Sequence, residues 1–155
     1  MSNVEQRLNE MGITLPDAPA PAANYVPFVK TGNLVFISGQ VPFVDGKLTM
    51  TGRLGDHATV EDGYAQARIC AINLIANLKV ACDGDLDRVT RVVKLGGFVA
   101  STDDFNSQPP VVNGASDLMV EAFGDAGRHA RFAVGTNALP LGCIVEVDGV
   151  FEIDG

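Results

Sequence analysis

The sequence predicts a single α+β domain with the element order β-β-β-α-β-α-β-β, in which two helices cover one face of a six-stranded mixed sheet. Short runs rich in β-branched and aromatic residues, bounded by Gly, Asn and Asp, indicate the strands. Two longer segments with apolar residues at helical spacing indicate the helices. The length of 155 residues and the hydrophobic content of 46% suit one domain with a substantial core.

Residues 1–23 are expected to form an extended N-terminal arm. The stretch LPDAPAPAA within it contains three prolines, which disfavour both a helix interior and a sheet ladder. A short helix at VEQRLNEMG is considered as the start of this arm. Residues 24–155 are then the single folded domain.

Three short strands are expected next, in the runs YVPFVK, NLVFIS and KLTM. Thr31-Gly32-Asn33 separates the first two. Asp45-Gly46 precedes the third and is a strong signal for a tight hairpin. We therefore expect the domain to begin with an antiparallel meander.

The first long helix is predicted within TVEDGYAQARICAINLIANLKVAC. Thr59 is a suitable cap, and the acidic Glu61 and Asp62 suit the positive end of the helix dipole. A long strand, RVTRVVKLGGFVA, is expected after the polar break DGDLD. Along the chain, this helix therefore connects two strands of the same sheet.

The second helix is predicted within NSQPPVVNGASDLMVEAFGDAG, with a stop at Gly124 or Gly127. The last two strands are expected at RFAVGT and CIVEVDGVFEI, joined across a Leu-Pro break. Val147 and Val150 of the last run point to opposite faces of the sheet, yet two helices cover only one face. The other face needs a partner, and self-association with closed symmetry is the simplest way to cover it.

The composition disfavours several classes of protein. Nineteen acidic against 11 basic residues give a net charge of −8, which repels phosphate backbones, so nucleic acid is not an expected partner. Neither a leader peptide nor a membrane-spanning run is recognisable, so we expect a cytoplasmic protein with three reduced cysteines and no membrane partner. With two histidines, no Cys-x-x-Cys pair and no phosphate-binding Gly motif, neither a metal nor another cofactor is expected.

The segment GRHARFAVGTNALP places Arg131 at the head of a strand. If the connection to the last strand folds symmetrically, Arg131 and Glu146 stand opposite each other on adjacent antiparallel strands, with Cβ atoms about 5 Å apart. An arginine fork matches a planar carboxylate through two parallel hydrogen bonds, so the pair indicates a site for a small anion. A surface salt bridge is the alternative. His129 is expected on a surface loop, with the cleft as its alternative position.

Three stretches resemble the RidA (YjgF) family, also described as endoribonuclease L-PSP-like. They are NYVPFVKTGNLVFISGQVP, the helix AQARICAINLIANLKVACDGDLDRVTRVVKLGGFV, and VVNGASDLMVEAFGDAGRHARFAVGTNALPLGCIVEVDGVFEI. The most specific parts are the Ser-Gly-Gln-x-Pro block and the spacing from Arg through Leu-Pro to Glu. The resemblance implies a chorismate-mutase-like fold and a homotrimer with ligand clefts between subunits.

The resemblance also implies a reaction, because better-known members of the family hydrolyse 2-imino acids to 2-keto acids and ammonia. Arg131 falls where the family has its carboxylate-binding arginine, and Glu146 where it has the acid that orients water. The implied ligand is a small 2-imino or 2-keto carboxylate. The implied substrate-binding residues are Tyr25, Ser38, Gly39, Asn113 and Ala133.

This chain departs from the family pattern after the arginine, where Phe132-Ala133 replaces Ser-Cys. The longer NSQPPVV segment also makes the alignment of Asn113 depend on where the insertion is placed. Two alternatives to imine hydrolysis stay open. One is a non-catalytic trimer that binds small carboxylates through Arg131. The other is an endoribonuclease, which the acidic composition disfavours.

Overall fold

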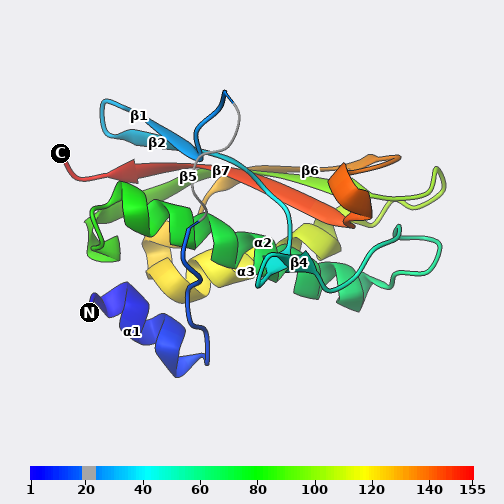
Figure 1. Cartoon of the computed structure of the whole chain (residues 1–155), viewed down its shortest axis with the longest axis horizontal. Coiled ribbons are helices and arrows are strands. Elements are labelled where there is room, and N and C mark those ends of the chain that lie inside the picture. Colours follow the sequence, from blue (N-terminus) through cyan, green and yellow to red (C-terminus); the bar gives the residue numbers. More distant parts are fainter. Residues whose placement is uncertain (19–23) are drawn as a thin grey trace.

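The computed structural model describes residues 1–18 and 24–155. It has two main layers, a five-stranded sheet and a pair of long helices (Figure 1). The main elements are α1 (Asn3–Glu10), β1 (Phe28–Thr31), β2 (Leu34–Gln40), α2 (Val60–Ala81), β5 (Val89–Ala100), α3 (Gln108–Phe123), β6 (Ala130–Thr136) and β7 (Val145–Ile153). The α+β class with a mixed sheet, predicted from the sequence, is confirmed.

The main sheet has five strands, so the prediction of a six-stranded sheet was wrong. The run KLTM supplies β4 (Lys47–Leu48), which pairs with β3 (Phe43–Val44) in a separate two-stranded hairpin. Asp45 and Gly46, which were expected to form a tight turn, both have positive φ and connect these two strands.

The hairpin is separate from the main sheet because the chain turns towards α2 after β2 ends. Pro42 has no N–H to donate to a continuing ladder. The side-chain amide of Asn73, on α2, donates to the carbonyl oxygens of Val41 and Phe43 at 3.0 and 3.1 Å. The side-chain hydrogen bonds of a helix residue thus replace the sheet ladder at this point.

The strands of the main sheet lie in the order β1-β2-β7-β5-β6. β6 is parallel to β5 and forms one edge, as expected for a β-α-β crossover through α3. β7 lies between β2 and β5 and is antiparallel to both. The connection over residues 137–144 therefore carries the chain past β5, and β6 and β7 do not form the adjacent pair that the sequence suggested.

Helices α2 and α3 lie together on one face of the sheet, as predicted (Figure 1). Thr59 caps α2 by accepting from the N–H of Asp62 at 3.1 Å, and the Asp62 carboxylate accepts from the N–H of Thr59 at 2.9 Å. The helices approach closely at Gly114, where an added Cβ would lie 2.0 Å from the carbonyl oxygen of Tyr64. Within residues 1–18 and 24–155, no helix is both long and apolar enough to cross a bilayer.

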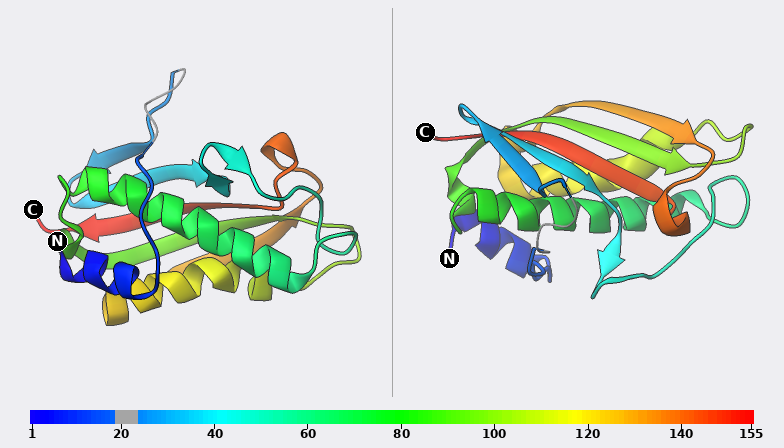
Figure 2. Two further views of the ribbon diagram at one scale, coloured as in Figure 1. Left: turned by 60° about the horizontal axis from the view of Figure 1, so that its bottom comes forward. Right: turned by 45° about the horizontal axis from the view of Figure 1, so that its top comes forward.

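Among the residues that the structure describes, no helix covers the opposite face of the sheet, which we call the uncovered face (Figure 2, right). Val29, Phe36, Phe98 and Val134 on the sheet strands are each between 39% and 53% exposed. Phe98 packs edge to face against Phe132, with ring centroids 5.3 Å apart. The solvated face of an antiparallel sheet is normally lined by polar residues, whereas this face carries several large apolar side chains.

The N-terminal segment contains α1, at the place where a short helix was considered, so this part of the predicted arm is not extended. α1 lies against α3 (Figure 2, left), and its Val4 and Leu8 are buried in the common core. Residues 19–23, which the sequence also assigned to the arm, lie outside the described residues.

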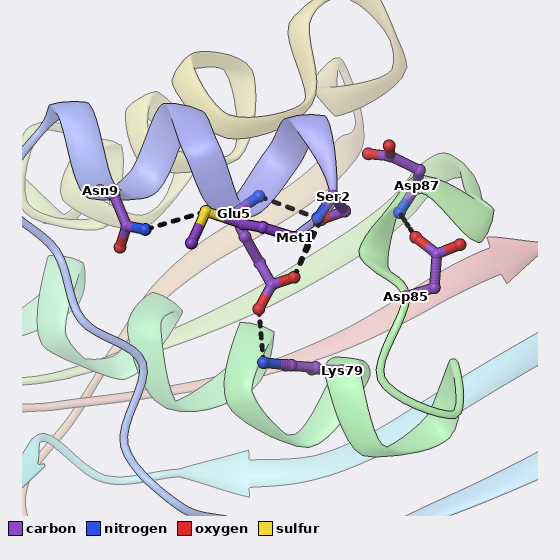
Figure 3. A network of polar contacts seen from close by, with 7 residues as sticks. All are labelled: Met1, Ser2, Glu5, Asn9, Lys79, Asp85 and Asp87. Atoms are coloured by element: carbon purple, nitrogen blue, oxygen red, sulfur yellow. Dashed lines mark hydrogen bonds and ion pairs between the residues drawn. The ribbon is translucent and has the colours of Figure 1, made fainter.

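Polar contacts fix both the start and one side of α1 (Figure 3). Ser2 accepts from the N–H of Glu5 at 3.1 Å, and the Glu5 carboxylate pairs with Lys79 of α2. Asp87, in the short 3₁₀ turn Leu86–Arg88, accepts from the N–H groups of Asn3 and Val4 at 2.9 and 3.1 Å. These backbone donors hold the pKa of Asp87 below its ordinary value.

Replacing Asp87 with Ala should lower the free energy of unfolding by about 1 kcal/mol, because two donors at the start of α1 lose their acceptor. Amide exchange in α1 should accelerate more than in α2. Since the folded pKa of Asp87 is lowered, its contribution is complete above the unfolded pKa and disappears as the pH falls through the folded one. The wild type and the variant should therefore converge in strong acid.

Denaturant unfolding at pH 7 and at pH 3 and below measures this difference. The matched control is Asp125→Ala, which removes a fully exposed carboxylate from the turn that follows α3. Equal stability of Asp87→Ala and Asp125→Ala at pH 7 would show that Asp87 does not anchor α1.

Candidate active site

Arg131 lies on the edge strand β6 and turns towards α3. Its Nη1 donates to Oδ1 of Asn113 at 2.8 Å and to Oγ of Ser116 at 3.2 Å. These two α3 residues are three positions apart and therefore share one side of the helix. Arg131 as a whole residue is partly buried. Among the ion pairs formed within residues 1–18 and 24–155, none includes Arg131.

Ser116 also contacts His129, with 2.8 Å between Oγ and Nε2. The other ring nitrogen, Nδ1, lies 2.6 Å from the carbonyl oxygen of Gly127. Burial lowers the pKa of His129 below 6.5, and the charge of Arg131 adds to this effect, while the bond to Gly127 opposes it. His129 lies in the loop before β6, as expected, but its side chain is partly buried, because the ring is held between α3 and the carbonyl oxygen of Gly127.

Glu146 lies on β7, on the uncovered face of the sheet. Gly39 of the neighbouring β2 leaves room for it, since a Cβ at Gly39 would lie 2.9 Å from Oε2 of Glu146. Burial raises the pKa of Glu146 above 4.5, and the negative charge of Asp148 raises it further. This carboxyl group therefore binds a proton more readily than an exposed glutamate does.

Ser38 fixes the segment that precedes β1. Its hydroxyl donates to the carbonyl oxygen of Val26, and its backbone N–H donates to that of Pro27, both at 2.9 Å. Tyr25 precedes this segment and is 63% exposed. Tyr25, Ser38 and Gly39 thus lie on the β2 side of the sheet, and two strands, β7 and β5, separate β2 from β6.

The predicted site residues form two separate groups within one chain. In the register of the sheet, Arg131 pairs with the buried Leu95 of β5, whereas Glu146 pairs with the exposed Phe98 of the same strand. Because strand residues alternate between faces, Arg131 points to the helix side of the sheet and Glu146 to the uncovered side. The expected direct pairing of Arg131 with Glu146 was therefore wrong.

Ala133 lies two residues after Arg131 on the same face of β6 and packs against the core. β6 is an edge strand, so one row of its backbone N–H and C=O groups has no neighbouring strand in the sheet. In the part of the chain that the structure describes, no three His, Cys, Asp or Glu side chains gather closely enough to hold a metal ion.

Sequence reasoning missed Ser116. Its signal was available, since Asn113 and Ser116 occupy positions i and i+3 of a predicted helix that leads directly into Arg131. The contact with β6 depends on the tertiary packing of α3, which spacing alone does not give.

This fold and these residues define a class of protein: a small α+β domain with a cationic fork at a sheet edge and a carboxylate on the uncovered sheet face. The chain belongs to the family described as "YjgF/chorismate mutase-like, putative endoribonuclease", whose model matches residues 5–152. The resemblance seen in the sequence is thereby confirmed.

Similar proteins include Protein TCP17 of Trypanosoma cruzi, which is 49% identical over 97% of this chain and 94% of its own length. The crystal structure of Atu1372, a protein with unknown function from Agrobacterium tumefaciens, is 48% identical. It covers 97% of this chain and 92% of its own, with a TM-score of 0.92. A 2-iminobutanoate/2-iminopropanoate deaminase of Dermatophagoides farinae is 29% identical over 92% of this chain and 95% of its own length.

Proposed function

We propose that this protein hydrolyses reactive 2-imino acids to 2-keto acids and ammonia. The observation that carries the proposal is the state of Arg131, a partly buried cation that is held by the neutral side chains of Asn113 and Ser116. A partly shielded cation that has no counter-ion among the described residues attracts an anion, and a substrate carboxylate would supply it. The deaminase named among the relatives supports this substrate class.

The hydrogen bonds of Arg131 leave a suitable surface for a carboxylate. Both of its side-chain bonds within the described residues start from Nη1, so Nε and Nη2 are available for a bidentate contact. The free edge of β6 beside Ala133 offers backbone groups to the same ligand. A carboxylate bound here would fix the position of the adjacent imine carbon.

The chemistry then requires one water and no cofactor. Glu146 takes a proton from water, whose oxygen bonds to the imine carbon while the C=N electron pair moves to nitrogen. The nitrogen takes that proton from Glu146, which gives a neutral carbinolamine. Glu146 then accepts the hydroxyl proton as the C=O bond forms and passes it to the departing nitrogen, which leaves as ammonia. The raised pKa of Glu146 suits a group that must both accept and donate a proton.

We further propose a homotrimer whose subunits each contribute half of the site. Within one chain Arg131 and Glu146 face opposite sides of the sheet, so two copies are needed to bring them to one ligand. The uncovered apolar face supports association, because its large side chains would otherwise stay partly exposed. The three free, buried cysteines fit a reducing, cytoplasmic setting, which we include in the proposal.

The test is to generate 2-iminobutanoate with an amino-acid oxidase and to follow the release of 2-oxobutanoate with and without the protein. We expect faster release in its presence and no effect of heat-denatured protein. Saturable binding of 2-oxobutanoate without acceleration of release would instead indicate the non-catalytic carboxylate binder. RNA cleavage that is lost on substitution of Arg131 would indicate the endoribonuclease, which the net charge of −8 disfavours.

A further inference from the structure

A chain of four hydrogen bonds runs behind the anion-binding side of Arg131. It starts at the carbonyl oxygen of Gly127, passes through His129 and Ser116, and ends at Arg131, which also bonds to Asn113. We propose that His129 and Ser116 are positioning residues, which orient the Arg131 guanidinium for carboxylate binding and make that binding depend on pH. Only the identity of the ligand rests on the proposed function.

The carbonyl oxygen of Gly127 determines which atom donates and which accepts in each hydrogen bond of this chain. The Gly127 carbonyl can only accept, so Nδ1 of His129 carries the hydrogen and Nε2 of the neutral ring is an acceptor. The Ser116 hydroxyl therefore donates to Nε2, and the lone pairs of Oγ remain for the N–H of Arg131. Neutral His129 thus orients Ser116 as an acceptor for the guanidinium.

Without this histidine the Ser116 hydroxyl would be free to rotate. A serine within a helix readily donates to the carbonyl oxygen four residues earlier, here that of Val112. Asn113 would then be the one acceptor that stays in a fixed orientation for the guanidinium. One bond does not define the orientation of a planar fork, whereas bonds to two acceptors on one side of α3 do.

Protonation of His129 should disturb the same arrangement. Both ring nitrogens then donate, so Nε2 competes with Arg131 for the oxygen of Ser116, and two cations share one hydroxyl group. Their repulsion would push the guanidinium away from α3. The lowered pKa places this change below pH 6.5.

Among the described residues, the charged group that shifts the pKa of His129 is Arg131. From α3 it faces Ser116, and from the turn Gly124–Gly127 it faces a carbonyl oxygen. Asp125 of that turn is paired with the exposed Arg128. On β5, Lys94 is level with Ala130, but its ammonium group lies over the ring of Phe132, on the other face of the sheet.

Calorimetric titration with 2-oxobutanoate between pH 5 and pH 8 tests the proposal. For the wild type we expect the Kd to rise about tenfold as the pH falls to 5, because one charge-assisted bond is lost. Ser116→Ala should bind about tenfold more weakly at pH 8 and show a flat profile. His129→Gln keeps an amide oxygen as acceptor but cannot be protonated, so it should bind like the wild type at pH 8 and stay flat.

The control is His57→Gln, which changes an exposed histidine elsewhere and should keep the wild-type profile. Circular dichroism and thermal unfolding check that Ser116→Ala is folded. Tighter binding at low pH would show that the histidine charge attracts the anion rather than misplacing Arg131, and would overturn the proposal. An unchanged profile in His129→Gln, or no binding by the wild type, would overturn it as well.

Binding and hydrolysis measurements distinguish a failure of the proposed reaction from a failure of the positioning role. If the wild type binds 2-oxobutanoate with the expected profile but does not hydrolyse 2-iminobutanoate, the positioning role stands and the reaction does not. If it does hydrolyse the imine, Ser116→Ala should raise KM and leave kcat nearly unchanged, because the carboxylate is held equally in the ground state and the transition state.

Discussion

Arg131→Lys is expected to lose about a hundredfold or more in kcat/KM for a 2-imino acid. Lysine keeps the positive charge but offers a single ammonium group in place of the planar fork, so the bidentate bond to the substrate carboxylate is lost. Lysine also cannot donate to Asn113 and Ser116 while it presents two parallel N–H groups to a ligand. A loss of about 3 kcal/mol in transition-state stabilisation corresponds to this factor.

Steady-state kinetics with imine generated by an oxidase measures the effect. Arg128→Lys is the matched control, because Arg128 lies three residues earlier with an exposed side chain that, within the described residues, pairs with the exposed Asp125. The control should keep wild-type kinetics. Full activity in Arg131→Lys would mean that positive charge, and not the shape of the fork, is what the site requires.

Glu146→Gln is expected to lower kcat by about 10² to 10⁴, with little change in KM, because the amide neither takes a proton from water nor returns one to ammonia. In the wild type kcat should rise with pH as Glu146 loses its proton, at a pH above its ordinary pKa of 4.5. This acidic limb should be absent from the residual activity of the variant.

Asp148→Asn separates the role of Glu146 from a general loss of acidic charge. The negative charge of Asp148 helps to raise the pKa of Glu146, so its removal should move the acidic limb to lower pH and preserve turnover at neutral pH. An unaltered limb in both variants would show that another group carries the proton transfer.

Local signals predicted the helices and most strands correctly, and the failures concern contacts between distant segments. Thr59 and the helical spacing after it determine the start of α2 through bonds between near neighbours. The turn at Asp45-Gly46 was recognised for the same reason. The position of β7 next to β2 and β5 depends on the whole sheet, and the local sequence indicated a symmetric hairpin between β6 and β7 instead.

The candidate site shows the same division. Arg131 was found from its place at the head of a strand, Asn113 was found through the family resemblance, and their contact is present in the structure. The roles of Ser116 and His129 were not found, because they depend on how α3 packs against the turn before β6. The separation of Glu146 from Arg131 follows from one intervening strand, which no local pattern reveals.

The central claim is that Arg131 of one copy and Glu146 of another serve the same ligand. Arg131→Ala and Glu146→Gln subunits, each nearly inactive alone, would be unfolded together, refolded in equal amounts and assayed for imine hydrolysis. If each site joins two neighbouring subunits, chance assembly leaves about a quarter of the sites with both groups intact, and about a quarter of the wild-type activity should return. No recovery in a mixture that demonstrably contains mixed trimers would contradict the claim.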